Sequence, residues 1–532
     1  MQPYYITTPI YYVNDRPHIG HCYTTTVADA ATRAIRLIRG TSDNIFFLTG
    51  TDEHADKVVT SAAERNYDPQ KWADINAQQF KDAFAKLNCS NNDFIRTTEP
   101  RHKDKVPGYI AKLQASGDIY KGLFTGWYDP GQEEYVPENE AREAEFKSKI
   151  TGKPLVQRSE DCYFFKLSAY QERLIAHINA NPTFIQPDSR RTEVLGRLKG
   201  GLRDVPVSRP VTDDPATQWG IRMPGDPENR VYVWIDALFN YYTAVDTPER
   251  KQYWPASVHL IGKDILWFHA VIWPALLMAL DVSLPKMIFG HGWWVSEGQK
   301  MSKTLGNFID LEKLEAYAAK HSLDGVRWYL LTQGPLSGAD ADFSHAKFIE
   351  VFNSDLANGI GNCASRVSNM IVKYFDGKMP TPSTPGNIEG YDFPALCAAA
   401  AANFEKKINA FDIAGAFHEA NELVRKVDGY INVTAPFKLA KTVEGNPAAK
   451  DQLAAILYNC AETVRVASIL MSPAMPQKMA SLWQTWNYTL PTATLAELAT
   501  FGGSASLKPN QTIAKGDALF MRADPAESIT SA

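Results

Sequence analysis

Residues 4–23, YYITTPIYYVNDRPHIGHCY, join a run of aromatic and β-branched residues to a polar turn that holds His18 and His21. The run is short and apolar, which is typical of a buried strand. The next stretch, YTTTVADAATRAIRLIRG, has apolar residues at helical spacing and ends at Gly40, which suits a helix C-cap. Residues 44–54, NIFFLTGTDEH, have the pattern of a second buried strand. Strand, helix and strand at this spacing predict a parallel βαβ unit.

The histidine turn has features of an anion-binding site. Ligands of parallel sheets bind beyond the carboxyl ends of the strands, where His18, His21, Asp52 and His54 are all expected. A helix that starts at a strand end exposes unpaired N–H groups and the positive end of its dipole, which suits phosphate. Gly20 lets the backbone approach closely, and the histidines add donors. Taken alone, the pattern is weak evidence and favours an ordinary turn that holds two hydrogen-bonded histidines.

Composition places the chain among ordinary globular proteins. Its 532 residues suffice for several domains, and 45% are hydrophobic and 22% charged. A net charge of −5 neither requires nor excludes a nucleic-acid partner. The six cysteines are scattered without a CxxC pair, which argues against a disulfide framework and favours reduced thiols. With no signal-peptide pattern and no apolar run of membrane-spanning length, we expect a soluble, cytoplasmic protein.

The residue composition and the apolar periodicity change along the chain, and these changes predict its domain organisation. Short aromatic stretches between Pro, Gly and charged turns indicate a module inserted into an α/β fold, because strand-like runs resume at RVYVWIDALFNYY. Beyond residue 350 the apolar periodicity is helical. We expect a first catalytic half, an inserted module, a second catalytic half, a loop region, a helical bundle and a surface-packed tail, at 1–116, 117–229, 230–295, 296–350, 351–500 and 501–532.

A second polar element, EGQKMSKTLGN, lies at residues 297–307. Lys300 and Lys303 offer two ammonium groups on a loop that could close over a triphosphate, with the Ser302 hydroxyl between them. A lone string of this kind would usually be an exposed, solvated loop. The histidine turn contains the string HIGH at residues 18–21. This string and the lysine loop, in this order and on either side of a split α/β fold, match the paired signatures of class I aminoacyl-tRNA synthetases.

Within that class the sequence most resembles the methionyl-tRNA synthetases. The similarity is carried by TPIYYVNDRPHIGH, FFLTGTDEH, YVWIDALFNY, HLIGKDILWFH and HGWW with GQKMSKTLGN. It runs from residue 2 to about residue 375 and continues more loosely through the helical part. The family joins methionine to ATP, which gives methionyl-adenylate and pyrophosphate, and passes the methionyl group to the 3′ end of tRNA. The resemblance implies a Rossmann-like parallel sheet split by an insertion and followed by an all-α anticodon-binding bundle, with 296–350 as lysine loop and stem-contact region.

The resemblance also assigns the active site. Charge on the pyrophosphate would be stabilised by His18, His21, Lys300 and Lys303, while Gly20 and Ser302 complete the ATP site and Mg²⁺ is carried on the phosphates. Asp52 would bind the α-ammonium of methionine, although without the family it would be assigned as a helix cap or a surface carboxylate. The methionine pocket maps to Ile10, Tyr12, Trp234, Ala237, Leu238, Tyr241, Ile265, Phe268, His269 and Trp273.

Aromatic walls with one or two polar groups near sulfur suit methionine, and Tyr12 and His269 are the expected polar groups. Long apolar strands need such aromatic residues for core packing as well, so each also has a purely structural interpretation. Because a missing methylene changes binding by only about 1–3 kcal/mol, homocysteine is the expected competing substrate.

The helical half is expected to bind the anticodon of tRNA(Met), including that of the initiator tRNA. Asn362 and Arg366 are four residues apart and match an N-x-x-x-R pair that the family uses on anticodon bases. Without the family, a polar pair at this spacing would usually be a solvated helix face. Phe437 lies where the family usually has a tryptophan that stacks on a base. Phenylalanine can still stack, with less area and no indole donor.

The chain departs from the family pattern in its insertion. Many members carry zinc-binding CxxC pairs there, but this chain has Asp129 and Gln132 at the corresponding place, so we expect no structural zinc. Ala55 replaces a usual glycine. The chain reaches residue 532 without the appended tRNA-binding module of some members, which favours a monomer.

Three alternatives share parts of this pattern. A small nucleotidyltransferase also uses an HxGH turn, but it needs neither a helical bundle nor the YVWIDALFNY segment. Other class I synthetases for aliphatic amino acids carry a much larger editing insertion. A tRNA-binding protein without catalysis would be free to lose His18, His21, Asp52, Lys300 and Lys303, all of which are present.

Overall fold

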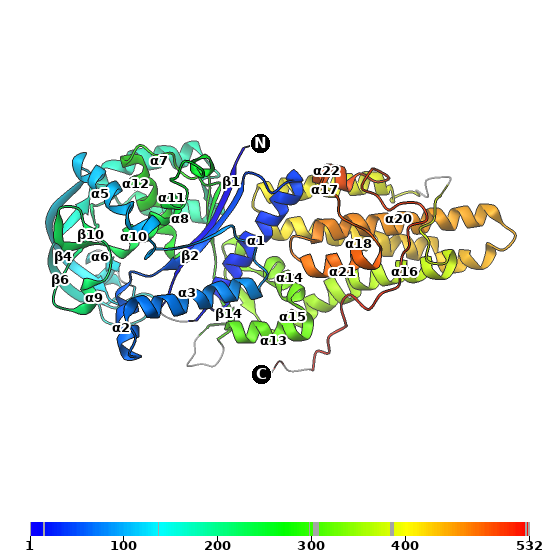
Figure 1. Ribbon diagram of the computed structural model, residues 1–532, viewed down its shortest axis with the longest axis horizontal. Coiled ribbons are helices and arrows are strands. Elements are labelled where there is room, and N and C mark those ends of the chain that lie inside the picture. Colours follow the sequence, from blue (N-terminus) through cyan, green and yellow to red (C-terminus); the bar gives the residue numbers. More distant parts are fainter. Residues whose placement is uncertain are drawn as a thin grey trace.

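The computed structural model describes residues 2–13, 16–132, 134–136, 138–296, 298–301, 308–382, 388–526 and 529. Within these ranges a six-stranded parallel sheet lies beside a helical bundle (Figure 1), so the α/β prediction is confirmed. The sheet order is β3-β2-β1-β12-β13-β7. Its strands are β1 (Tyr4–Tyr12), β2 (Ile45–Asp52), β3 (Asp93–Arg96), β7 (Ile185–Gln186), β12 (Val258–Gly262) and β13 (Ile288–His291).

Helices cover both faces of this sheet. The first crossover is α1 (Ile19–Arg39), which ends as expected at Gly40 in the left-handed region, φ 65°. Successive residues of β12 point to opposite sides: Leu260 packs with α1, while Ile261 packs with helices on the other face of the sheet. The other helices of this part are α2 (Asp56–Glu64), α3 (Pro69–Lys86), α4 (Pro100–Lys103), α5 (Val106–Ala115), α10 (Val233–Leu238), α11 (Asn240–Thr243) and α12 (Trp273–Ala279).

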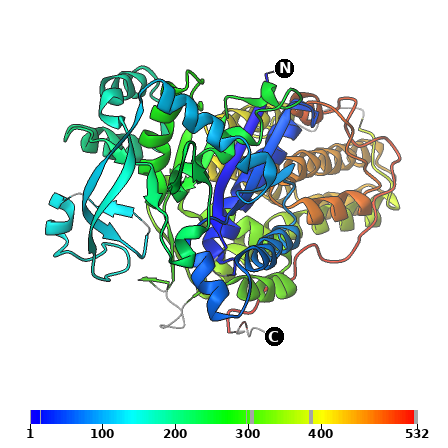
Figure 2. The same ribbon diagram turned by 60° about the vertical axis from the view of Figure 1, so that its left-hand side comes forward.

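The inserted module is built on antiparallel strands, which Figure 2 shows in cyan on the side of the sheet away from the bundle. One short strand departs from the expected boundaries: β7, inside 117–229, pairs in parallel with β13 at the edge of the main sheet. A two-residue strand is too short to leave a periodic signal. The module contains β4 (Ile119–Asp129), β5 (Glu134–Val136), α6 (Glu138–Glu143), β6 (Val156–Phe165), α7 (Gln171–Ala180), α8 (Asp188–Leu198), β8 (Val205–Pro206), β9 (Ser208–Pro210), α9 (Pro215–Gln218), β10 (Arg222–Met223) and β11 (Asp226–Val231).

A small sheet and three helices connect the parallel sheet to the bundle. They are β14 (Trp294–Ser296), β15 (Gln299–Lys300), α13 (Leu311–His321), α14 (Leu323–Gln333), β16 (Ala341–Phe343) and α15 (His345–Val351). The bundle begins with a π-helical segment, Phe352–Gly361. It continues through α16 (Asn362–Phe375), α17 (Phe393–Asn409), α18 (Ile413–Thr434), α19 (Pro436–Leu439), α20 (Pro447–Met471), α21 (Pro476–Thr485) and α22 (Leu495–Ala499).

The bundle is packed around α20. By length and apolar composition this described helix could cross a membrane, but 94% of its apolar window is buried inside the protein, as expected of a core helix. The tail crosses the bundle surface (Figure 1) and is anchored by buried Leu507, Ile513 and Phe520. It returns to the π-helical segment, where the Asn353 side chain exchanges hydrogen bonds with the backbone of Ala523 at 2.9 and 2.8 Å.

A buried ion pair joins α1 to α14. The Arg327 guanidinium lies 2.6 Å from Asp29, and neither side chain is exposed to solvent. Arg327 also donates to the carbonyls of Leu87, Pro473 and Ala474 at 2.9, 3.1 and 2.9 Å. One side chain therefore ties together α1, the segment after α3 and the α20–α21 connection of the bundle.

We expect Asp29→Ala to lower the free energy of unfolding by about 3–5 kcal/mol, because it leaves the Arg327 charge buried without its carboxylate. Arg425→Ala breaks the exposed pair with Glu422 and should cost at most about 1 kcal/mol. Urea denaturation of both variants measures the difference. Equal, small losses in the two variants would contradict a structural role for the buried pair.

Candidate active site

The two histidines of the opening turn cap α1. Nδ1 of His18 accepts a hydrogen bond from the Gly20 amide (3.1 Å), and Nδ1 of His21 accepts one from the His18 amide (3.3 Å). The rings stack with centroids 3.8 Å apart. Because each ring uses Nδ1 as an acceptor, the proton of the neutral ring lies on Nε2. Both rings therefore present an Nε2–H donor beside a helix N-terminus, where an anion binds well.

His21 is held as an uncharged donor. Burial lowers its pKa well below the usual value, and the neighbouring His18 lowers it further. Its ring packs against both Tyr11 and Phe80, with centroids 4.7 and 5.2 Å away. At neutral pH the ring can donate a hydrogen bond to a developing negative charge without first losing or gaining a proton.

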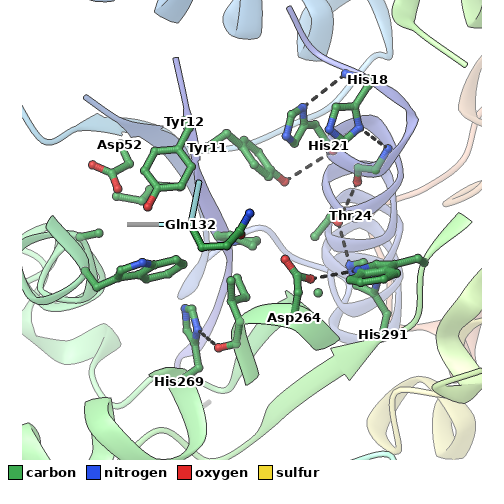
Figure 3. Close-up of a pocket in the computed structure, with 18 of the residues that line it drawn as sticks. Tyr11, Tyr12, His18, His21, Thr24, Asp52, Gln132, Asp264, His269 and His291 are labelled. Carbon is green, nitrogen blue, oxygen red and sulfur yellow. Dashed lines mark hydrogen bonds between the residues drawn. The ribbon is translucent and has the colours of Figure 1, made fainter. Parts of the chain in front are cut away.

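A cavity of about 560 Å³ extends from this turn across the carboxyl ends of the parallel strands (Figure 3). Asp52, at the end of β2, lies at its far side with Tyr12 (Figure 3). Most of the residues that the sequence assigned to the ATP and methionine sites line it, namely Ile10, Tyr12, His18, Gly20, His21, Asp52, Trp234, Ala237, Leu238, Tyr241, Ile265 and His269. One continuous space thus joins an anion-binding helix end to a carboxylate and an apolar wall.

Phe268 and Trp273 do not line the cavity. Phe268 stacks behind Trp234, with ring centroids 4.1 Å apart and planes 10° from parallel. Trp273 is fully buried, and its indole Nε1 donates to Nε2 of His259 at 3.3 Å. In this conformation both side chains support the wall from behind, which is the core-packing alternative that applies to any aromatic residue of a buried strand or helix.

The polar groups at the base of the pocket form a directed chain. His269 Nδ1 lies 2.9 Å from the Ile265 carbonyl, which can only accept, so Nδ1 carries the proton. Nε2 is then an acceptor, and the Tyr241 hydroxyl donates to it at 2.8 Å. Burial lowers the pKa of His269 to about 4, so the ring is neutral near pH 7. In this arrangement His269 has no N–H to offer a substrate sulfur, and Tyr12 is the remaining predicted polar group.

Sequence reasoning missed several cavity residues. Gly262 ends β12, Asp264 follows it, and His291 ends β13, so the rule that ligands bind at strand carboxyl ends could have found all three. The Asp264 carboxylate accepts from the Trp293 indole at 3.1 Å, and both residues line the cavity. Gln132 reaches the cavity from the insertion (Figure 3), a contact that no local pattern indicates.

The lysine loop is bounded by described residues on both sides. On one side the backbone of Lys300 pairs with Val295 in β14. On the other, Asp310 bridges to His18, and the Ile309 carbonyl accepts from the Ile19 amide at 3.0 Å. Ser302 and Lys303 lie outside the described residues. The loop thus ends directly beside the start of α1.

Asp129 serves a local turn at the place where the family resemblance would put a zinc-binding cysteine. Its Oδ1 accepts from the Gly131 and Gln132 amides at 2.7 and 3.2 Å. Among the described residues no group of three or more His, Cys, Asp or Glu side chains is arranged to hold a metal ion.

The proposed anticodon residues lie in the bundle, away from the cavity. Asn362 is exposed at the start of α16, and Arg366, one turn later, pairs with Asp428 of α18 at 2.8 Å. Phe437 on α19 is 46% exposed, which is unusual for a phenylalanine in a helical bundle. The structure therefore presents an aromatic ring and a polar pair on this part of the molecule.

A parallel sheet split by an insertion, a capped helix N-terminus facing a cavity and a following bundle define a class I tRNA synthetase. A family model described as "tRNA synthetases class I (M)" matches residues 4–144 and 141–368. The methionine–tRNA ligase of Caldanaerobacter subterraneus is 40% identical over 99% of this chain and 80% of its own length, and that of Streptomyces coelicolor is 40% identical over 98% and 96%. Mycobacterium tuberculosis methionyl-tRNA synthetase in complex with methionyl-adenylate superposes with a TM-score of 0.87 at 34% identity, covering 98% of this chain and all of that chain. The chain belongs to the methionine–tRNA ligase family.

The buried neutral histidine predicts a pH dependence of stability. The pKa of His269 is about 4 in the folded chain and about 6.5 when unfolded, so between these values only the unfolded chain binds the proton. The free energy of unfolding should therefore fall as the pH falls, by about 1.5 kcal/mol from this ring between pH 6.5 and pH 5. His269→Leu should remove that loss, measured by urea denaturation at both pH values.

The exposed His418 gives the matched control. His418→Gln should keep the pH dependence of the unmodified chain. An unchanged pH dependence in His269→Leu would contradict a neutral, buried His269.

Proposed function

We propose that this chain activates L-methionine with ATP and transfers the methionyl group to tRNA(Met), the initiator tRNA included. The supporting observation is the single cavity of about 560 Å³ that joins the capped N-terminus of α1 to Asp52 and an apolar wall. A triphosphate suits the helix end, and an α-amino acid with an apolar side chain suits the other part. ATP enters as its Mg²⁺ complex, with the ion carried on the phosphates.

In the first step the methionine carboxylate attacks the α-phosphate, and the bond to pyrophosphate breaks. The carboxylate is already a nucleophile, so no base is needed, and the chain contributes alignment and stabilisation of charge. Asp52 holds the α-ammonium group. The Nε2–H groups of His18 and His21 donate to phosphate oxygens as charge moves onto pyrophosphate. By resemblance, Lys300, Ser302 and Lys303 act on the same phosphates from the loop.

The apolar wall accounts for the choice of methionine. Trp234, Ala237, Leu238 and Ile265 surround an unbranched side chain, and Tyr12 provides a polar group near sulfur. Smaller apolar amino acids lose about 1–3 kcal/mol for each missing methylene. Homocysteine differs by one methyl group and is therefore the closest competitor.

In the second step a hydroxyl of the 3′-terminal ribose of tRNA attacks the adenylate carbonyl, and AMP leaves. We assign anticodon recognition to Asn362, Arg366 and Phe437. The exposed ring of Phe437 offers a surface for base stacking. Arg366 then exchanges its contact with Asp428 for the nucleic acid. We further propose that the protein acts as a cytoplasmic monomer. We also propose that it has no structural zinc, because Asp129 caps a turn where the family resemblance would put a cysteine.

The first test is ATP–pyrophosphate exchange without tRNA, run with all common amino acids and homocysteine. Methionine should support the fastest exchange. His21→Ala and Lys303→Ala should each reduce kcat about 10²–10³-fold, because each removes a group that stabilises charge in the transition state. His21→Gln, whose amide N–H can replace Nε2–H, should retain more activity than His21→Ala. No exchange with any amino acid in folded protein would leave an RNA-binding protein as the explanation.

The anticodon assignment predicts a separate loss. Phe437→Ala should raise the KM for tRNA in aminoacylation about tenfold, since stacking on one base is worth about 1–3 kcal/mol. Exchange without tRNA should be unaffected. Met521→Ala, which removes another exposed apolar side chain, is the control and should change neither reaction. An unchanged KM for tRNA in Phe437→Ala would place anticodon contact elsewhere.

A further inference from the structure

Three buried polar side chains meet behind the methionine part of the cavity. The Asp236 carboxylate lies 2.6 Å from Nδ1 of His54 and 2.8 Å from Nε2 of His102. The three residues are 1%, 4% and 0% exposed, respectively. None of them lines the cavity. Removing a carboxylate from water costs free energy even when two imidazoles lie beside it. The position of this cluster in the fold indicates what it contributes.

Two of the three side chains, those of His54 and Asp236, come from segments that form walls of the pocket. His54 follows Asp52, the proposed ammonium ligand, by two residues at the end of β2. Asp236 lies on α10, between Trp234 and the cavity residues Ala237 and Leu238. The carboxylate therefore connects the ammonium-binding wall directly to the wall that contacts the methionine side chain.

His102 extends the connection to a third element. It lies on α4, and its other ring nitrogen is 2.9 Å from the hydroxyl of Thr243 on α11. The next helical segment reinforces the same contact, since Lys105 donates to the Thr243 carbonyl at 3.1 Å. The helix that carries Trp234 is thus held from both the β2 side and the α4 side.

The end of β2 is fixed on its other side as well. Glu53 turns away from Asp236 and accepts from the Arg96 guanidinium at 2.7 and 2.9 Å. Its carbonyl accepts from the Trp219 indole at 2.6 Å. Adjacent residues therefore hold the segment in opposite directions, and the contact of His54 with Asp236 joins it to α10.

The carboxylate is ionised in the folded chain. Burial alone would raise the pKa of Asp236, but the adjacent His54 and His102 lower it below its usual range. An ionised carboxylate accepts hydrogen bonds from both rings at once, whereas an amide offers only one acceptor oxygen. The two-sided contact depends on the charge and not only on the shape of the side chain.

We propose that Asp236 is a positioning residue for methionine: it sets the separation between Asp52, which binds the ammonium group, and Trp234, which contacts the side chain. The inference rests on the proposed function of the cavity. It predicts that loss of the carboxylate weakens methionine binding and leaves the ATP part of the cavity, built on α1, unchanged.

The primary test is Asp236→Asn in ATP–pyrophosphate exchange with the full chain. Because one buried N–H loses its acceptor, at about 1–3 kcal/mol, we expect the KM for methionine to rise about tenfold or more. The KM for ATP should change less than about twofold, by the same conversion of free energy to affinity. A merely structural defect would lower the active fraction, and so kcat, without changing the KM for methionine alone.

Glu462→Gln is the matched control, because it removes an equally buried carboxylate that pairs with Arg465 at 2.6 Å inside the bundle. We expect its thermal stability to fall and both KM values to stay unchanged. A normal KM for methionine in folded Asp236→Asn would overturn the proposal. So would an equal rise in Glu462→Gln.

A second pair of variants decides the matter if Asp236→Asn fails to fold. His54→Asn places an amide N–H close to the position of Nδ1–H, whereas His54→Ala removes the donor. The KM for methionine should rise in His54→Ala and be largely restored in His54→Asn. Equal values in the two variants would overturn the proposal alone, since normal exchange by the unmodified chain upholds the proposed function. No exchange by the unmodified chain would overturn both.

Discussion

The fold depends on a charge that water does not reach. Burial would raise the pKa of Asp29, but the Arg327 and Arg33 guanidinium groups lower it below its usual value, so Asp29 is ionised. Its second oxygen accepts from the amide and hydroxyl of Ser90, both at 2.6 Å. A buried pair is tolerable only when its remaining donors and acceptors are satisfied, as they are here by three carbonyls and a serine. That requirement fixes how α1, α14 and the bundle meet.

The position of α1 matters because its N-terminus borders the cavity, whereas its later turns pack against the bundle. The N-terminus is capped by side chains that also face the cavity, so any shift of the helix would move the anion site. Farther along, Val27, Ala31 and Ile35 belong to the same apolar core as the bundle residues Phe417 and Val424. Because α1 packs in both parts of the molecule, it fixes how the two parts are oriented. The proposed phosphate site and the proposed anticodon surface therefore sit on one connected core.

Local patterns in the sequence were enough for the main elements. Alternation of apolar runs with helical spacing predicts a parallel sheet, and the sheet places His18, His21 and Asp52 at one edge because parallel strands end on the same side. The methionine walls came from resemblance and not from periodicity, and the structure brings most of them to the cavity. Phe268 and Trp273 are set back from it because their rings pack against Trp234 and His259, contacts that a single segment does not encode.

What the sequence by itself determined is the order of strands and helices, the turn that caps α1 and the family. The first two depend on residues close together in the chain, and the family depends on several short motifs in a fixed order. Only the tertiary structure decided which residues far apart in the chain form buried hydrogen bonds or ion pairs. His54 and Asp236 are separated by 182 residues, and Arg327 and Asp29 by 298. The fold removes both pairs from water, and there the partner of a polar group must be protein.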